Sequence, residues 1–199
     1  MVPTGVALRD VREQLFSAAE RVVLRSGANG LTSRAVTAEA GVAKGVLHRH
    51  FADFDAFLVE LVHDRARRLE AQFAALRARA GTGTVVEQLT GALTELFSSV
   101  AVALVGLIIF RDELRARLRS RYPSGVPLLT EAAAMLTAYL AAERDRGRIA
   151  ADADVEMLAL TMIGSGHLVF ADRQGGPPDP RAVERMVRSV VGGSVIAPR

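Results

Sequence analysis

The chain has 199 residues, of which 50% are apolar and 24% are charged, a balance typical of a globular protein with a buried core. It contains no cysteine, which excludes disulfides, thiolate metal sites and thiol nucleophiles and fits a reducing compartment. The net charge of +3 lies in residues 1–52, which carry seven Lys/Arg and four Asp/Glu, whereas residues 53–199 carry eighteen of each. A basic N-terminal part on a neutral body suits phosphate binding at one end of the molecule.

The apolar stretches are too short for a membrane protein. The longest, residues 100–110, has eleven residues, whereas a membrane-spanning helix needs about 20. Charged residues at positions 9–13 precede any apolar run, which is not the pattern of a signal peptide. We therefore expect a cytoplasmic protein without a membrane partner.

The first fifty residues predict three helices. Apolar residues spaced three and four apart between positions 8 and 22 form one face of an amphipathic helix. Thr32 or Ser33 is a suitable N-cap for a short second helix, which Gly41 ends. A short third helix follows at residues 43–50.

The sequence pattern also predicts helices in the remainder of the chain. Asp53 is a suitable cap for a long helix that ends near residue 80. No segment alternates with a period of two, so no sheet is expected. The predicted fold is all-α with about nine helices, and those after residue 80 are expected at residues 85–104, 106–121, 128–146, 152–171 and 181–191.

The second and third helices match helix-turn-helix geometry, in which the second helix of the pair enters the major groove of DNA. Gly41 suits the turn because glycine tolerates a positive φ. Ala38 and Ala40 are small enough for two helices to cross closely. Apolar side chains that would hold the pair against a core are Val36, Val42, Val46 and Leu47.

Residues 31–51 resemble the signature of the TetR family of bacterial repressors, and the resemblance extends over about residues 8–60. Its parts are a threonine that opens the second helix, an Ala-Gly-Val turn, a glycine shortly after it, and a Leu-x-x-His-Phe run. In this chain they are Thr32, Ala40-Gly41-Val42, Gly45 and Leu47-His48-Arg49-His50-Phe51.

Three positions depart from the family pattern. His48 replaces a tyrosine, Ala43 replaces a serine before the recognition helix, and Phe54 replaces a lysine that would contact phosphate. The resemblance therefore implies DNA binding and leaves open which bases are read.

The DNA-facing residues are predicted from their chemistry. Hydroxyl groups at a helix start bind phosphate, while arginine, lysine and histidine donate to phosphates or base edges. Gly45 would let the helix backbone approach DNA closely. The predicted DNA-binding residues are Thr32, Ser33, Arg34, Ala43, Lys44, Gly45, His48, Arg49 and His50.

Two later segments, 96–110 and 155–170, are apolar nearly all round, so they are expected to be buried. Three interpretations of these segments remain open: an ordinary core, a ligand cavity and a subunit interface. The resemblance implies an effector pocket in these helices, for which the candidates are Phe97, Val100, Leu104, Leu107, Met135, Tyr139, Met162 and His167.

The last two predicted helices suit a four-helix interface between two subunits. Apolar side chains expected there are Leu158, Met162, Val169, Val183, Met186, Val187 and Val190.

These patterns predict a homodimer with a DNA-binding domain at residues 1–52, the start of a linking helix up to about residue 60, and an effector-binding and dimerisation domain at residues 53–199. The resemblance implies a repressor that a small apolar or amphipathic ligand releases from a pseudo-palindromic double-stranded operator. Two alternatives remain: a helical small-molecule-binding protein or enzyme, and an architectural DNA-binding protein without an effector. We expect no enzyme, because the chain carries no recognised catalytic motif. His48 and His50 point about 200° apart on a helix, so no metal is expected, and neither is a cofactor.

Overall fold

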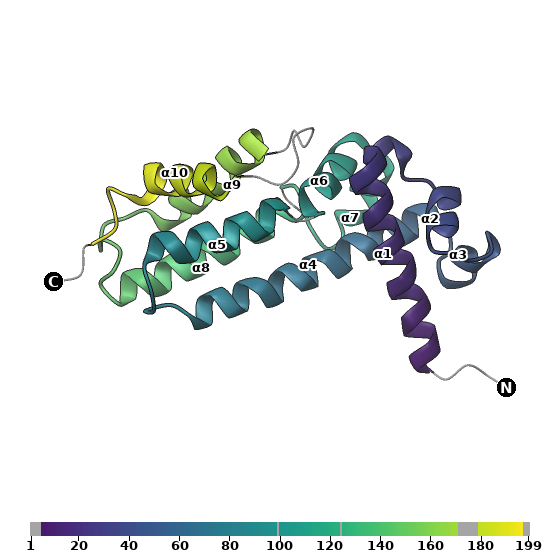
Figure 1. Ribbon diagram of the computed structural model, residues 1–199, viewed down its shortest axis with the longest axis horizontal. Coiled ribbons are helices and arrows are strands. Elements are labelled where there is room, and N and C mark those ends of the chain that lie inside the picture. Colours follow the sequence, from purple (N-terminus) through teal and green to yellow (C-terminus); the bar gives the residue numbers. More distant parts are fainter. Residues whose placement is uncertain (1–4, 99, 124, 171–178, 197–199) are drawn as a thin grey trace. The chain divides into compact units, whose positions relative to one another are not determined.

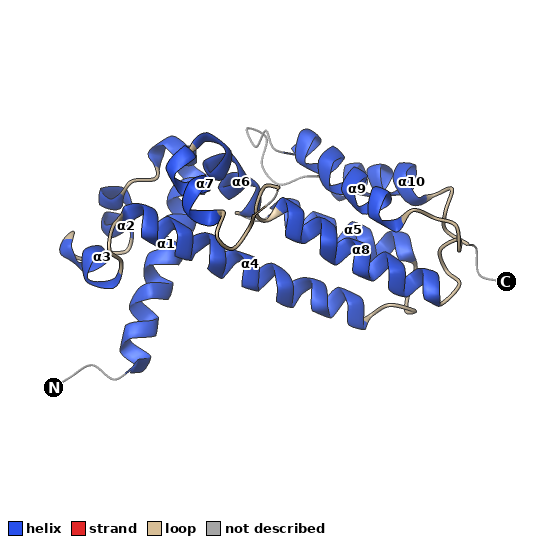
Figure 2. Ribbon diagram, turned by 180° about the vertical axis from the view of Figure 1, so that it is seen from behind, coloured by secondary structure: helices blue, strands red, loops and turns tan. Residues whose placement is uncertain are grey.

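The computed structural model describes residues 5–98, 100–123, 125–170 and 179–196, and the regular structure in these ranges is helical (Figures 1 and 2). An isolated antiparallel bridge joins Ile149 to Val195, and no strand is formed within these ranges. The all-α prediction is confirmed. The ten helices described are α1 (Gly5–Gly30), α2 (Ser33–Glu39), α3 (Gly45–His50), α4 (Phe54–Ala78), α5 (Val85–Ser98), α6 (Ala101–Phe110), α7 (Asp112–Leu118), α8 (Leu129–Asp145), α9 (Val155–Phe170) and α10 (Pro180–Val191).

The two helices predicted between residues 85 and 121 are in fact three, α5, α6 and α7. Gly106, where the sequence pattern places a break, lies inside α6. The chain instead leaves the helical conformation at Arg111, which is extended at φ −122° and ψ 90°. Glycine permits a break without requiring one, so neighbouring contacts decide where the helix ends.

The chain divides into two compact units, which we describe separately. The first contains Met1–Asp64 and Ala103–Ser124, and the second contains Arg65–Val102 and Gly125–Arg199. Helices α4 and α6 contribute residues to both. The first unit thus includes most of α6 and all of α7, although more than fifty residues of the chain separate them from α3.

The core of the first unit is built on aromatic side chains. Phe16 of α1, Phe51 after α3 and Phe57 of α4 pack with ring centroids 5.0–5.9 Å apart, and all three are buried. Burying one such side chain stabilises a fold by about 1.5–3 kcal/mol. Leu47 of α3 is also fully buried, so α3 is fixed to the same core.

In the second unit α8 packs on α9, and α10 packs on α5 and α9. Val183, Val187 and Val191, spaced one turn apart on α10, are fully buried. The expectation that Val183, Val187 and Met162 form a subunit interface is therefore wrong, because all three side chains are already buried within the subunit.

A buried carboxylate ties two turns of the second unit together. Glu143 of α8 is fully buried and accepts hydrogen bonds from the Gly81 amide at 3.2 and 3.3 Å. Nε of Arg148 lies 3.1 Å from Oε2 of Glu143, and Arg148 also donates to the Gly83 carbonyl at 2.8 Å. The α4–α5 turn is thus bound to α8 and to the segment that follows it.

Within the part of the chain that the structure describes, no single helix is long and apolar enough to cross a membrane. The bent pair Val85–Phe97 and Ala101–Phe110 reaches that length and composition only when its two helices are taken together.

Candidate nucleic-acid interface

The start of α2 is fixed by a threonine cap. Thr32 is extended, at φ −126° and ψ 157°, and its hydroxyl accepts a hydrogen bond from the Ala35 amide at 3.1 Å. This bond satisfies one of the amides that every helix start leaves without an intrahelical partner. Of the two caps that the sequence permits, the structure selects Thr32.

The turn between α2 and α3 has the conformation that the motif requires. Gly41 has a φ of +67°, in the left-handed region that glycine enters without steric strain. On the α1 side, Gln14 donates from Nε2 to the Ala40 carbonyl at 2.7 Å. The turn is therefore held both by its own backbone conformation and by a side chain from α1.

Helix α3 presents a short polar face. Leu47 anchors it in the core, while Lys44, His48 and Arg49 are exposed. A Cβ added at Gly45 would meet no other atom within 4 Å, so the space over this glycine is open. The start of α3 is therefore exposed to solvent at this glycine.

The end of α3 is held by Arg12 of α1, a residue that sequence reasoning missed. Its guanidinium carbon lies 4.4 Å from the centroid of the Phe51 ring. It donates to the His50 carbonyl at 3.4 Å and forms an ion pair with Glu60 at 3.1 Å. Arg12 therefore positions the end of α3, and nothing in the local pattern of α1 distinguishes it from a solvated arginine.

The exposed cations of the head, residues 11–64, fall into two groups. Arg21 and Arg25 of α1 both bind the Glu39 carboxylate, at 2.7 and 2.9 Å, and these hydrogen bonds lower the pKa of Glu39. In contrast, Lys44 and Arg49 form no ion pair with any described residue. Arg34 at the start of α2 likewise has no acidic partner among the residues described. The start of α2 and the exposed side of α3 therefore carry positive charge that the described residues of the head do not neutralise.

The predicted DNA-binding residues gather at two places in the first unit, the start of α2 and the length of α3. Most of them are exposed, while Ser33 and His50 are half-buried. The Ser33 hydroxyl is itself buried and has no partner among the described residues, so it is not free to contact phosphate in this arrangement.

The predicted effector-binding residues are largely buried. Phe97, Val100, Tyr139 and Met162 of the second unit are at most 4% exposed, and Met135 and His167 of the same unit are half-buried. Leu104 and Leu107 are buried too and belong to the first unit. That these eight side chains line a pocket stays a prediction.

The second unit has an open groove elsewhere. It lies between α8 and α9, has a volume of about 570 Å³, and contains none of the eight predicted side chains. Its walls are mostly apolar and include Leu129, Ala133, Leu160, Ile163 and Gly164.

Comparison with known proteins identifies the N-terminal segment. Residues 15–61 match the sequence model described as bacterial regulatory proteins, tetR family. The segment is thus similar to the N-terminal part of tetR-family regulators. A curated HTH-type transcriptional regulator from Haemophilus influenzae is 37% identical over 57 residues, a match that spans 29% of this chain and only 30% of that protein.

Solved structures extend the likeness from residues 15–61 to the whole fold. A TetR-family transcriptional regulator from Agrobacterium tumefaciens has a TM-score of 0.71 at 16% identity, covering 94% of this chain and 99% of its own. A transcriptional regulator from Rhodococcus gives 0.70 at 21% identity, with 94% and 99% covered. The regulator FadR from Bacillus subtilis, solved in complex with stearoyl-CoA, gives 0.65 at 19% identity, with 91% and 98% covered. The chain thus has the fold of TetR-family transcriptional regulators.

Proposed function

We propose that this protein is a dimeric transcription regulator that binds a specific DNA sequence through α2 and α3. The observation that carries the proposal is the exposed face with Arg34, Lys44 and Arg49, whose charges have no acidic partner among the described residues, beside the open space over Gly45. Lysine and arginine on such a face neutralise phosphates and read guanine edges. Helix α3 would enter the major groove, and the start of α2 would contact the backbone.

The DNA-binding proposal is tested with the Lys44→Ala/Arg49→Ala variant. A duplex is first selected from a random pool by the unaltered protein, and binding is then measured by fluorescence anisotropy at fixed salt. We expect binding to weaken by at least about 30-fold, because each of the two base or phosphate contacts contributes about 1–3 kcal/mol.

The matched control is Arg119→Ala/Arg121→Ala, which removes the same charge from two exposed arginines of the same unit. It should change affinity by less than about threefold, the part that net charge alone contributes. Equal losses in the two variants would contradict the assignment of Lys44 and Arg49.

We also propose that two copies associate through α9 and α10. Helix α9 exposes Met157, Leu160, Leu168 and Val169, which are 55–84% accessible, and Leu160 also lines the α8–α9 groove. Several exposed apolar side chains on one helix are typical of a subunit interface. Two heads related by a two-fold axis would read a pseudo-palindromic operator. Leu160→Glu should give a monomer in sedimentation, whereas an unchanged dimer would place the interface elsewhere.

For the effector, we propose a small apolar or amphipathic ligand that binds the second unit and releases the protein from its operator, which makes the protein a repressor. The support is the apolar character of α9 and the structural neighbour that was solved with an acyl-CoA. By linkage, a ligand that lowers DNA affinity must itself bind the DNA complex more weakly by the same factor. Acyl-CoAs and apolar compounds are screened by thermal shift and then tested for loss of DNA binding.

The two alternatives predict different results in the same experiments. An enzyme or carrier would bind a ligand without any effect on DNA affinity. An architectural protein would show little sequence preference and no stabilising compound. We propose that the chain is not an enzyme and works without a cofactor, in the cytoplasm of a bacterium.

A further inference from the structure

The first turn of α4 (Phe54–Ala78) determines where the recognition helix lies. Helix α3 is followed by Phe51, which is buried in the core, and only Ala52 and Asp53 separate Phe51 from α4. Two residues span a few ångströms, so α3 moves with the start of α4. Any contact that fixes this turn also fixes the recognition helix.

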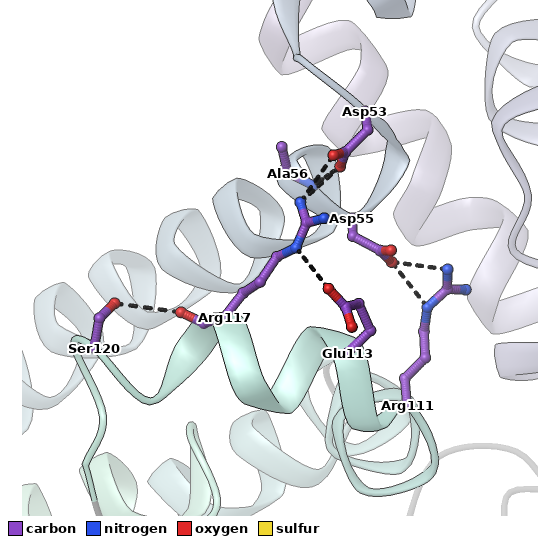
Figure 3. Close-up of polar contacts among 7 residues, drawn as sticks. All are labelled: Asp53, Asp55, Ala56, Arg111, Glu113, Arg117 and Ser120. Carbon is purple, nitrogen blue, oxygen red and sulfur yellow. Dashed lines mark hydrogen bonds and ion pairs between the residues drawn. The ribbon is translucent and has the colours of Figure 1, made fainter.

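One ion pair joins Asp53 to α7 (Figure 3). Nη1 of Arg117 lies 2.8 Å from Oδ1 and 3.0 Å from Oδ2 of Asp53. Asp53 also caps α4, because its Oδ1 accepts the Ala56 amide at 2.7 Å. These hydrogen bonds, first from the Ala56 amide and then from Arg117, hold the pKa of Asp53 below its usual value.

A second ion pair lies beside the first. Arg111, between α6 and α7, donates from Nη2 and Nε to Oδ1 of Asp55, at 2.8 and 3.1 Å. Its guanidinium carbon is 5.6 Å from the centroid of the Phe54 ring. Both carboxylates thus come from the start of α4, and both arginines come from residues 56 and 64 positions further along the chain.

Helix α7 is a firm support for these pairs. Leu114 and Leu118, one turn apart, are at most 1% exposed, so the helix is anchored in the core of the first unit. Yet residues 103–124 come after the stretch 65–102, which belongs to the second unit. Two arginines from the region predicted to bind the effector therefore hold the turn that follows the recognition helix.

We propose that Arg111 and Arg117 are positioning residues for DNA binding, and that the Asp53–Arg117 and Asp55–Arg111 ion pairs form a clamp that keeps α3 in its DNA-reading position. This inference rests on the DNA-binding function proposed above and adds the contact through which the region after residue 102 controls it. An effector that displaces α7 would weaken the clamp and lower the fraction of molecules ready to bind, which lowers the apparent affinity by that fraction.

The solvent exposure of the two ion pairs determines how strongly they should affect DNA affinity. Asp53 and Arg117 are 50% and 36% exposed, and the Asp55–Arg111 pair is 21% and 38% exposed, so solvent screens both pairs. A pair of this kind changes an equilibrium by about 1.7-fold to threefold. The two factors multiply, so both pairs together change it by about threefold to tenfold.

The sign of the effect separates a clamp from simple electrostatics. Asp53→Asn/Asp55→Asn removes two negative charges from a unit that binds a polyanion, so net charge alone would tighten DNA binding. Loss of the clamp would weaken it instead. Asparagine caps helices as well as aspartate does, so the hydrogen bond to Ala56 is retained.

The experiment compares Asp53→Asn/Asp55→Asn with the control Glu13→Gln/Asp112→Asn, using the duplex selected by the unaltered protein. Glu13 and Asp112 are exposed, and the ion pair of Asp112 is with Arg115 inside α7, so the control makes the same charge change without touching the clamp. We expect binding about threefold to tenfold weaker in the clamp variant and unchanged or tighter in the control. Equal or tighter binding in both variants would overturn the proposal.

A charge-exchange variant distinguishes loss of the ion pair from a general loss of folding. Asp55→Arg and Arg111→Asp should each weaken binding, and the double variant Asp55→Arg/Arg111→Asp should restore it to within about twofold. A double variant as weak as Arg111→Asp would overturn the proposal, since a pair that acts through its charges tolerates exchange.

Failure of the clamp and failure of the proposed function give different results. If the unaltered protein selects no duplex from the random pool, the DNA-binding function is wrong. If it selects one and the clamp variant binds that duplex as tightly as the control does, only the clamp is wrong.

Discussion

Gly166→Ala in α9 should destabilise the second unit, because the Phe97 ring lies directly on this glycine. A Cβ built at Gly166 would be 1.9 Å from Cζ and 2.1 Å from Cε2 of Phe97, whereas carbon atoms in contact are about 3.5–4.0 Å apart. The ring would have to retreat by about 1.5–2 Å. Phe97 is 1% exposed, and its ring centroid lies 5.4 Å from that of Phe170, so it has little room to do so.

The expected change in the free energy of unfolding is the balance of two effects. Overpacking a core costs about 1–3 kcal/mol, while replacing glycine by alanine inside a helix returns about 0.5–1 kcal/mol. We expect Gly166→Ala to lower the free energy of unfolding by about 1–2 kcal/mol in urea titrations. Gly91→Ala is the control, because Gly91 lies on the helix that carries Phe97 and has no atom within 4 Å of its built Cβ. It should raise stability by about 0.5–1 kcal/mol.

The same substitution in a Phe97→Ala variant tests whether the Phe97 ring causes the loss of stability. With Phe97→Ala, the ring that opposes a side chain at position 166 is gone, so Gly166→Ala should then stabilise the protein as Gly91→Ala does. If Gly166→Ala stabilises the unaltered protein too, or destabilises both backgrounds equally, the contact with Phe97 does not control this position.

Three further outcomes are expected in the head. Thr32→Ala removes the α2 cap and should lower the free energy of unfolding by about 1 kcal/mol. Thr32→Ser should keep most of the stability that the cap contributes. Equal losses for both variants in urea titrations would contradict the assignment of Thr32 as the cap. Gly41→Ala forces alanine to a φ of +67° and should lower stability by about 1–2 kcal/mol, with a cooperative transition confirming that the head still folds. Arg21 and Arg25 lower the pKa of Glu39, so its contribution to stability is complete above about pH 5. That contribution is lost as pH falls through the pKa of the folded state, so Glu39→Gln should flatten the acid side of the stability profile, and an unchanged profile would contradict this assignment.

Local features of the DNA-binding head could be predicted from the sequence. The Thr32 cap, the Gly41 turn and the Asp53 cap each depend on one residue and the few that follow it, and such short-range chemistry is readable without a structure. The burial of Leu47 followed from the helical period in the same way.

Contacts between distant segments could not be predicted. Arg12 meets Phe51 across 39 positions, and Arg117 meets Asp53 across 64. In the sequence neither arginine can be distinguished from any other exposed arginine. Helical periodicity shows on which side of a helix a residue lies, but not which distant residue it contacts. The inward side of α10 was missed for a related reason: Val183 and Val187 form an apolar stripe that suits a subunit interface and a subunit core equally well.

Lys44, exposed at the start of α3, is the single lysine among 24 arginines. Amine-directed chemistry therefore modifies only this side chain and the chain's own α-amino group. Reductive methylation with a ¹³C label would place one side-chain NMR signal at the proposed DNA surface while retaining the charge of the lysine. The recognition helix can thus be observed in the intact protein, with and without DNA, without introducing a cysteine or any other substitution.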